Sequence, residues 1–293
     1  MTQPLNRRAF VTRTLATAAA AGATWFDTPR LLADARADAL KKYGGFPMGL
    51  QSYSLRAFGI DGPEGALAKI QELGLHYVEF FRAHFPPTQD QAKIDEMKEK
   101  LKKYDLTISA HGVQGFTKDH AANEAFFKFA KAAGIRNISA DPTPDAYDSL
   151  DKLCAQYDIR IAIHNHGPGA RFDKLDQLLA AVKGRHPHIG ACADLGHYIR
   201  SAEDPVEVIT KIGNRLFGVH LKDFAEQKKE TKGVILGKGH LDVVGVFKAL
   251  KKVKFPADGA LSLEYEENPK NPMDEIKECL AVAAEAAQKA AKG

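Results

Sequence analysis

The sequence predicts a single (β/α)₈ barrel, an α/β fold in which eight parallel strands alternate with helices around one core. From Pro47 onward, short apolar runs alternate with amphipathic segments, and no linker or change of composition separates them. This alternation indicates βα units around a parallel sheet. Residues 44–293 also supply the roughly 250 residues that such a barrel needs. The alternative, an open doubly wound sheet, would usually carry a Gly-rich phosphate turn after its first strand, and residues 49–55 lack one.

Eight runs are predicted to be strands because each is short, rich in apolar residues and followed by a polar or amphipathic segment. In chain order they are Met48–Tyr53, Tyr77–Phe81, Leu106–Ala110, Asn137–Ala140, Ile159–His164, Ile189–Asp194, Leu216–Leu221 and Ala260–Tyr265. Eight strand–helix repeats are what a closed barrel requires, so we favour the barrel over the open sheet.

Capping and turn signals indicate helices between these strands. Asp204 and Pro205 place a capping carboxylate before a proline at the first helical position, which predicts a helix over Val206–Ile212. Gly134 is expected to end a helix over residues 126–133. Further helices are predicted from Asp61–Glu64 to Gly74, over Gln91–Lys103, from Val243 with Asp242 as its cap, and over Met273–Lys289.

The first 35 residues are predicted to be a twin-arginine export signal, and residues 36–293 to be the barrel domain. Arg7 and Arg8 precede Phe10, and a weakly apolar, Ala-rich stretch follows over residues 14–26, with small-residue cleavage sites at 21–23 or 33–35. This stretch is shorter than the ~20 residues of a spanning helix, so no stable membrane anchor is expected. The signal predicts a periplasmic or otherwise exported protein; the alternative is an ordinary amphipathic N-terminal helix.

Charge and cysteine content exclude some classes of protein. The formal net charge is +4, and no basic stripe with interleaved aromatic residues appears, so no nucleic-acid partner is expected. Cys154, Cys192 and Cys279 are odd in number and widely spaced, which argues against a disulfide framework or a thiolate zinc site. We expect all three to be structural. A homo-oligomer is compatible with the sequence.

Ionisable side chains gather at the C-terminal ends of the last four predicted strands, the end at which barrel active sites lie. Because side chains alternate faces along a strand, residues two apart point the same way. The pairs that share a face are His164 and His166, His220 and Lys222, and Glu264 and Glu266, while Asp194 and His197 end the sixth strand.

Burying so many ionisable groups without partners would cost several kcal/mol each. A divalent cation satisfies carboxylates and imidazoles together, so we predict a metal ion held by His164, Asp194, His220 and Glu264. Nitrogen and oxygen ligands without thiolate suit Mn²⁺, which we expect first, or Mg²⁺, Co²⁺ or Zn²⁺. The alternative is a rim of salt bridges without metal.

Four motifs resemble the xylose-isomerase-like superfamily of sugar isomerases and epimerases, over about residues 47–285. They are Asp194-x-x-His197, His220-Leu-Lys222-Asp223, Leu236-Gly-Lys-Gly-His-Leu-Asp242 and Ser262-Leu-Glu264. The resemblance implies a TIM barrel in which Asp194, His220 and Glu264 bind the metal and His197 lies beside the substrate. It also implies that Lys222 points the same way as the ligand His220.

One position departs from the family pattern. Members of this family usually carry Glu-Asn-His on strand five, where this chain has His164-Asn165-His166. Epimerases of this type use two metal-bound glutamates on opposite faces of the substrate, so Glu264 is left as the only carboxylate of that pair. His164 can still bind metal, and either it or His166 can act as acid or base near neutral pH. A strand-five His resembles the inosose dehydratase branch, which eliminates water next to a ketone.

We therefore expect a metal-dependent isomerase or epimerase that removes a proton next to a carbonyl of a sugar or keto-polyol. Glu264 is the expected base, and His166, His197 and Lys222 are expected to orient oxygens or stabilise negative charge. Glu79, His111, Gln51 and Glu266 are candidate substrate contacts. Three alternatives are a lyase or hydratase acting on a keto-sugar or keto-glycoside, apurinic endonuclease chemistry, and a non-catalytic exported sugar-binding protein.

Overall fold

The computed structural model of the protein describes residues 28–59 and 62–292. The chain divides into residues 1–38 and 39–293. The twin-arginine motif and the apolar stretch after it lie outside the described residues, and export remains a prediction. Helix α2 (Thr28–Lys42) runs across the predicted boundary between signal and barrel domain.

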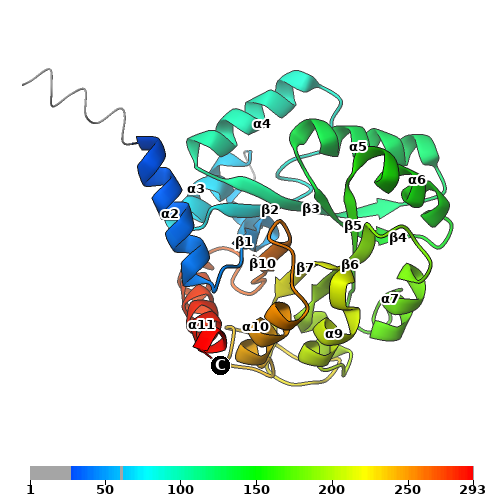
Figure 1. Ribbon diagram of the computed structural model, residues 1–293. Helices are drawn as coiled ribbons and strands as arrows, with labels where there is room; N and C mark the ends of the chain where they lie inside the picture. The colour runs from blue at the N-terminus through cyan, green and yellow to red at the C-terminus, as the bar shows by residue number, and fades with distance from the viewer. Residues whose placement is uncertain (1–27, 60–61, 293) are drawn as a thin grey trace, which may run out of the picture. The chain divides into compact units, whose positions relative to one another are not determined.

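Eight parallel strands close into a barrel within residues 39–293, as predicted (Figure 1). Around the barrel each strand pairs with its neighbours in the order β1-β10-β7-β6-β5-β4-β3-β2. The strands are β1 (Met48–Gln51), β2 (Tyr77–Phe81), β3 (Thr107–Phe116), β4 (Asn137–Pro142), β5 (Arg160–His164), β6 (Ile189–Asp194), β7 (Leu216–Leu221) and β10 (Ala260–Leu263). The open-sheet alternative is therefore wrong.

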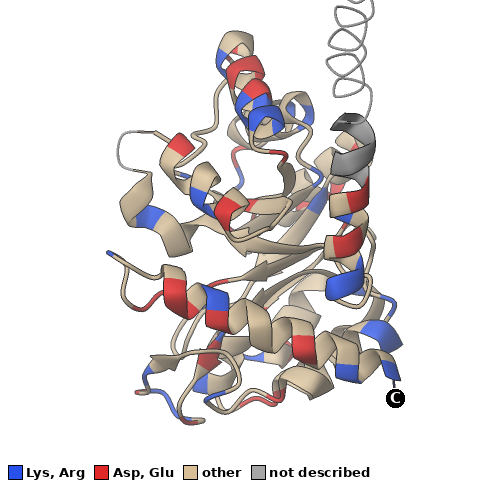
Figure 2. Ribbon diagram, turned by 90° about the vertical axis from the view of Figure 1, so that its left-hand side faces the viewer, with Lys and Arg blue, Asp and Glu red and all other residues tan. Residues whose placement is uncertain are grey.

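Helices lie outside the strands, and their apolar faces close the core (Figure 1). They are α3 (Glu64–Glu72), α4 (Gln91–Lys103), α5 (His120–Ala133), α6 (Tyr147–Tyr157), α7 (Leu175–Val182), α8 (Leu195–Arg200), α9 (Pro205–Ile212), α10 (Val243–Lys252) and α11 (Met273–Lys292). Short 3₁₀ helices are η1 (Ser52–Phe58) and η2 (Gly213–Arg215). Acidic and basic side chains are interspersed along the helices in view in Figure 2.

The predicted helix caps are confirmed by their hydrogen bonds. The Asp204 carboxylate accepts from the amides of the first turn of α9, and Asp242 accepts from the amide of Gly245 in α10. Gly134 ends α5 in the left-handed region, with φ of 78°, a conformation that glycine adopts without steric cost. The capping residues in the sequence therefore predicted these helix ends correctly.

Several elements differ from the predictions; among them, α5 begins at His120 and not at residue 126, and β10 ends at Leu263 and not at Tyr265. Strand β3 extends from the predicted end at Ala110 to Phe116, because residues beyond Ala110 pair with β4 after a register shift. The first strand ends at Gln51, whose side-chain oxygen accepts from the Tyr53 amide and opens η1. Helix α8 begins directly after β6, where a turn was expected, because the Asp194 side chain caps it.

A two-stranded antiparallel ribbon lies in the connection after β7. It pairs β8 (Asp223–Phe224) with β9 (Gly233–Val234). All three cysteines are buried and free, as expected of structural residues. Among the described helices, none is both long enough and apolar enough to cross a bilayer.

Candidate metal centre and substrate cavity

The four predicted ligands meet at the C-terminal end of the barrel. His164 Nε2 lies 3.1 Å from His220 Nδ1, and His220 Nδ1 lies 3.3 Å from Glu264 Oε2. Asp194 Oδ2 lies 3.8 Å from each of these two imidazole nitrogens. One donor atom from each residue falls within 4.8 Å of all the others, and all four side chains are buried. The four side chains that strand alternation predicted to share one end of the barrel therefore lie together.

The donor set fits a divalent ion. Nitrogen and oxygen ligands about 2.1 Å from a common ion lie roughly 3.0–3.5 Å apart in octahedral or tetrahedral geometry. The 3.1 and 3.3 Å separations fall in this range, and the 3.8 Å separations to Asp194 need only a small side-chain movement. Two imidazoles and two carboxylates, without thiolate, are ligands that Mn²⁺, Co²⁺ and Zn²⁺ accept. This group could hold one metal ion.

Asn165 and Asp194 join the ends of β5 and β6. The Asp194 amide donates to Asn165 Oδ1 over 2.8 Å, and Asn165 Nδ2 donates to the Asp194 carbonyl over 3.0 Å. Asp194 Oδ1 also accepts from the His197 amide over 2.8 Å, as the cap of α8. The Asp194 carboxylate is therefore fixed at one oxygen, which leaves Oδ2 directed at the two imidazoles.

Glu79 lies beneath His220, inside the barrel. Its Oε2 atom is 3.0 Å from His220 Nε2, a contact whose alignment falls short of a hydrogen bond. The hydroxyls of Ser139 and Ser262 donate to the two carboxylate oxygens over 2.5 and 2.7 Å. A carboxylate on the far nitrogen of a metal-ligating imidazole orients the ring and favours the proton on that nitrogen. Glu79 is placed to do this for His220.

Lys222 supplies a positive charge to the same group. Its ammonium donates to Glu264 Oε2 over 2.9 Å and to Asp194 Oδ2 over 3.4 Å, and it also contacts Glu266. Gly196 makes room for this side chain, because a Cβ atom there would lie 2.7 Å from Lys222 Cγ. The salt-bridged rim and the ligand cluster are thus both present in one structure.

The pKa shifts follow from burial and from these charges. Burial alone would raise the pKa of Glu264, but Lys222 and His220 outweigh it and hold that pKa well below its usual range. Burial and the neighbouring His220 lower the pKa of His164 far below its usual value. Burial opposes the charge of Lys222, yet Asp194 and Glu264 raise its pKa above the usual range. Glu264 therefore stays ionised and His164 neutral at pH 7.

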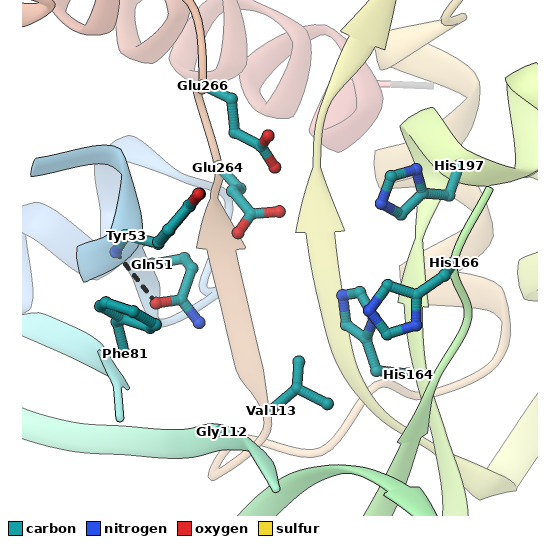
Figure 3. A pocket seen from close by; sticks show the side chains of 10 residues that line it. All are labelled: Gln51, Tyr53, Phe81, Gly112, Val113, His164, His166, His197, Glu264 and Glu266. Carbon is teal, nitrogen blue, oxygen red and sulfur yellow. Dashed lines mark hydrogen bonds between the residues drawn. The ribbon is translucent and has the colours of Figure 1, made fainter. Parts of the chain in front are cut away.

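A cavity of about 270 Å³ opens above this cluster (Figure 3). Figure 3 shows His164, His166 and His197 on one side, with Gln51, Tyr53 and Phe81 on the opposite side and Glu264 and Glu266 between them. Gly112 and Val113 of β3 complete the lining. The walls therefore combine imidazoles, carboxylates, an amide and aromatic rings, a mixture that suits a small polar ligand.

The structure places most of the predicted site residues on this cavity. The cavity is lined by His166, His197, Gln51 and Glu266. Lys222 contacts Glu264 and Glu266, two of the lining residues. Two candidate substrate contacts lie elsewhere. Glu79 is fully buried under His220. The fully buried His111 contacts the carbonyl of Phe85 through Nε2 and packs against aromatic rings of α5.

Sequence reasoning missed Phe81, Val113 and the role of Asp223. Phe81 and Val113 line the cavity but are apolar, so no chemical signal marked them. The Asp223 carboxylate accepts from the amides of Gly237, Gly239 and Leu241 over 2.9 to 3.0 Å. It therefore holds the Leu236–Asp242 loop. The joint occurrence of the His220–Asp223 and Leu236–Asp242 motifs in the sequence could have indicated this contact.

Known proteins share both the sequence pattern and the fold. The chain is 30% identical to an inosose dehydratase of Clostridium botulinum over 146 residues, which is 43% of this chain and 48% of that protein. It thus spans about half the length of the curated relatives it matches. An uncharacterised protein of Parabacteroides distasonis is 28% identical with a TM-score of 0.63, over 83% of this chain and 98% of that one.

A structure of L-ribulose 3-epimerase matches with a TM-score of 0.65 and 15% identity, over 84% of this chain and 96% of that one, and shares the fold. Two of these three proteins carry the names of enzymes, a dehydratase and an epimerase. A family model described as xylose isomerase-like TIM barrel matches residues 67–285. By that match and by its closed barrel, the chain belongs to the xylose isomerase-like TIM barrel family.

Proposed function

We propose that the protein is a divalent-metal-dependent lyase that removes a proton next to the carbonyl of a keto-sugar and eliminates an oxygen substituent from the following carbon. The observation that carries this proposal is the buried donor group of His164, Asp194, His220 and Glu264 at the floor of a sugar-sized cavity. When bound, the ion would polarise the carbonyl and stabilise the negative charge that develops on its oxygen. Mn²⁺ is the ion we propose first, for the mixed nitrogen and oxygen ligands.

Glu264 is the proposed base. Its carboxylate lines the cavity in the ionised form, which is the form that can accept a proton from carbon. Lys222 balances the charge of this carboxylate from 2.9 Å. As the C–H bond breaks, its electron pair forms the new C=C bond, and the C–O bond to the leaving group breaks.

The wall across from Glu264 supplies the second proton transfer. His164, His166 and His197 line it, with ring centroids 4.7 Å apart for His164 and His166 and 5.8 Å apart for His166 and His197. Burial lowers the pKa of His197, which favours the neutral ring. We assign His166 as the proton donor to the departing oxygen, because its ring lines the cavity next to a ligand. The dehydratase relative supports elimination as the outcome.

An isomerase or epimerase is the second candidate. It is favoured by the placement of imidazoles across the cavity from Glu264, since a group on that wall could return a proton to the other face of the same carbon (Figure 3). A non-catalytic sugar-binding protein would need the cavity but would have no use for the four buried donor side chains beside it. Apurinic endonuclease chemistry would need a basic DNA-binding surface, and the helices in view in Figure 2 carry charges of both signs. Export stays part of the proposal on the sequence motif alone.

Mass spectrometry in D₂O tests the proposal. Purified protein loaded with Mn²⁺ is incubated with 3-keto-glucosides, and the masses of the substrate and the products are measured. Elimination releases water or an alcohol, whereas isomerisation conserves mass apart from one deuterium. We expect Glu264→Gln to lower the rate by about 10²–10⁴-fold, the usual contribution of a general base. Glu99→Gln, an exposed carboxylate of α4, is the control and should leave the rate unchanged. Absence of deuterium incorporation and of elimination on every keto-sugar would contradict the proposal.

A further inference from the structure

A second hollow lies beyond Glu264 and Glu266, on the side of the β8–β9 ribbon. Its volume is about 260 Å³, and its lining includes Arg200, Phe224, Thr231 and Glu267. Glu264 and Glu266 line both this hollow and the cavity above the ligand cluster. The two spaces therefore meet at these two glutamates, both of which pair with Lys222.

Arg200 presents hydrogen-bond donors that the protein itself does not use. Its Nε atom donates to the carbonyl of Lys229 over 3.2 Å, and its guanidinium lies 5.5 Å from the centre of the Phe224 ring. Among the interactions of residues 28–59 and 62–292, Arg200 forms no ion pair with a carboxylate, and its two terminal nitrogens make no hydrogen bond. A Cβ atom at Gly167 would lie 2.9 Å from Arg200 Nη1, so glycine there leaves room for the guanidinium.

The charges around this hollow select against an anionic ligand. Arg200 and Lys222 are the cationic side chains of the lining, while Asp223, Glu264, Glu266 and Glu267 are the acidic ones. Three backbone amides bind the Asp223 carboxylate, and Lys222 pairs with Glu264 and Glu266. Glu267 has no ion-pair partner in the described part of the chain. A phosphate or carboxylate would meet an excess of negative charge here, whereas sugar hydroxyls can both donate to Glu267 and accept from Arg200.

We propose that this hollow binds a second, uncharged sugar ring joined to the ring that reacts, so that the preferred substrate is a neutral keto-disaccharide or a similar glycoside. Each hollow alone is smaller than the roughly 300 Å³ of a typical small-molecule site, and the two together fall inside that range. The inference rests on the proposed function for the identity of the reacting ring. In an elimination, the second ring would be the leaving group, held by Arg200 and Glu267 as it departs.

Binding of unreactive sugars tests this subsite without turnover. Glucose, cellobiose and maltose are titrated into ¹⁵N-labelled protein loaded with diamagnetic Zn²⁺, and dissociation constants are measured from NMR chemical shifts. We expect at least one disaccharide to bind about tenfold more tightly than glucose. The amide signals of Thr231 and Gly233, which line the second hollow, should shift with that disaccharide and not with glucose.

Variants locate the effect. Arg200→Gln and Glu267→Gln should each reduce the preference for the disaccharide to under threefold while leaving the affinity for glucose unchanged. Lys228→Gln, an exposed change in the same ribbon loop that pairs with Glu226, should keep the full preference. Equal affinities for glucose and both disaccharides, or a preference that survives in both variants, would overturn the subsite. A protein that still eliminates water or an alcohol in the keto-sugar assay would then retain the proposed function, whereas loss of both results would contradict both proposals.

Discussion

Two regions of the barrel bury histidines on strands, and the pKa values of these histidines shift in opposite directions. His220, at the end of β7, lies among Glu79, Asp194 and Glu264. Burial alone would lower its pKa, but the acidic groups around it raise that pKa well above the usual value. His111, on β3, is buried as deeply among aromatic rings, and burial lowers its pKa to about 4. Burial on a barrel strand therefore does not identify a functional histidine, because the charges packed against the ring decide its chemistry.

The largest expected effect, on metal binding, comes from replacing Asp194, one of the acidic residues around His220. Asp194→Ala and Asp194→Asn should both weaken metal binding by more than 100-fold, above the about 10–100-fold cost of losing an outer partner of a ligand. The measurement is metal content and affinity, by elemental analysis and calorimetry. The two variants differ in the α8 cap, because an asparagine oxygen can still accept from the His197 amide.

The cap gives this experiment an internal control. In chelator, Asp194→Ala should unfold with a free energy about 1 kcal/mol lower than that of Asp194→Asn, which is the typical value of a helix cap. Both variants should fail to bind metal at the concentration that saturates the wild type. If either bound metal with wild-type affinity, Asp194 would be a capping residue only, and the salt-bridged rim would be the better account.

The aromatic region should show its effect in the pH dependence of stability. His111 has a pKa of about 4 in the folded protein against 6.5 for an ordinary histidine. Between these values the unfolded state binds more protons, so its contribution is complete above pH 6.5 and is lost as the pH falls toward 4. The full loss is about 3 kcal/mol, at 1.36 kcal/mol for each pKa unit.

Denaturant unfolding at pH 7 and pH 4.5 measures this loss. His111→Gln keeps a donor for the Phe85 carbonyl but cannot titrate, so its stability should fall by less than that of the wild type over the same interval. His240→Gln, at an exposed position, is the control and should follow the wild type. Parallel pH profiles for the wild type and His111→Gln would show that burial of the neutral ring contributes nothing to the pH dependence.

The comparison also shows what the sequence could predict. The bounds of β2, β6 and β7 agree with the predicted ones, because each is an apolar run between clear turn or capping signals. The ligand group was predictable because strand alternation fixes which side chains share a face. The surroundings of His111 were not predictable. Alternation along a strand does not show whether a side chain packs against charged groups or against the rings of Phe126 and Phe129. Likewise, the extension of β3 depends on a register shift against β4 that only tertiary pairing creates.

The smallest expected effect tests the contact between the inner barrel and the ligand group. Glu79→Gln removes the negative charge 3.0 Å from His220 Nε2 while its amide can still bond to Ser139 and Ser262. We expect metal affinity to fall about 10–100-fold, as for other carboxylates behind ligating histidines. Calorimetric titration measures this fall, and ¹⁵N NMR of the His220 ring shows whether the proton leaves Nε2. Glu266→Gln is the matched control, because Glu266 contacts Lys222 and no imidazole ligand, and it should change the affinity less than threefold. Equal affinities in Glu79→Gln and Glu266→Gln would mean that Glu79 only fills the barrel interior, in which case His220 would be oriented by Asp194 and Glu264 alone.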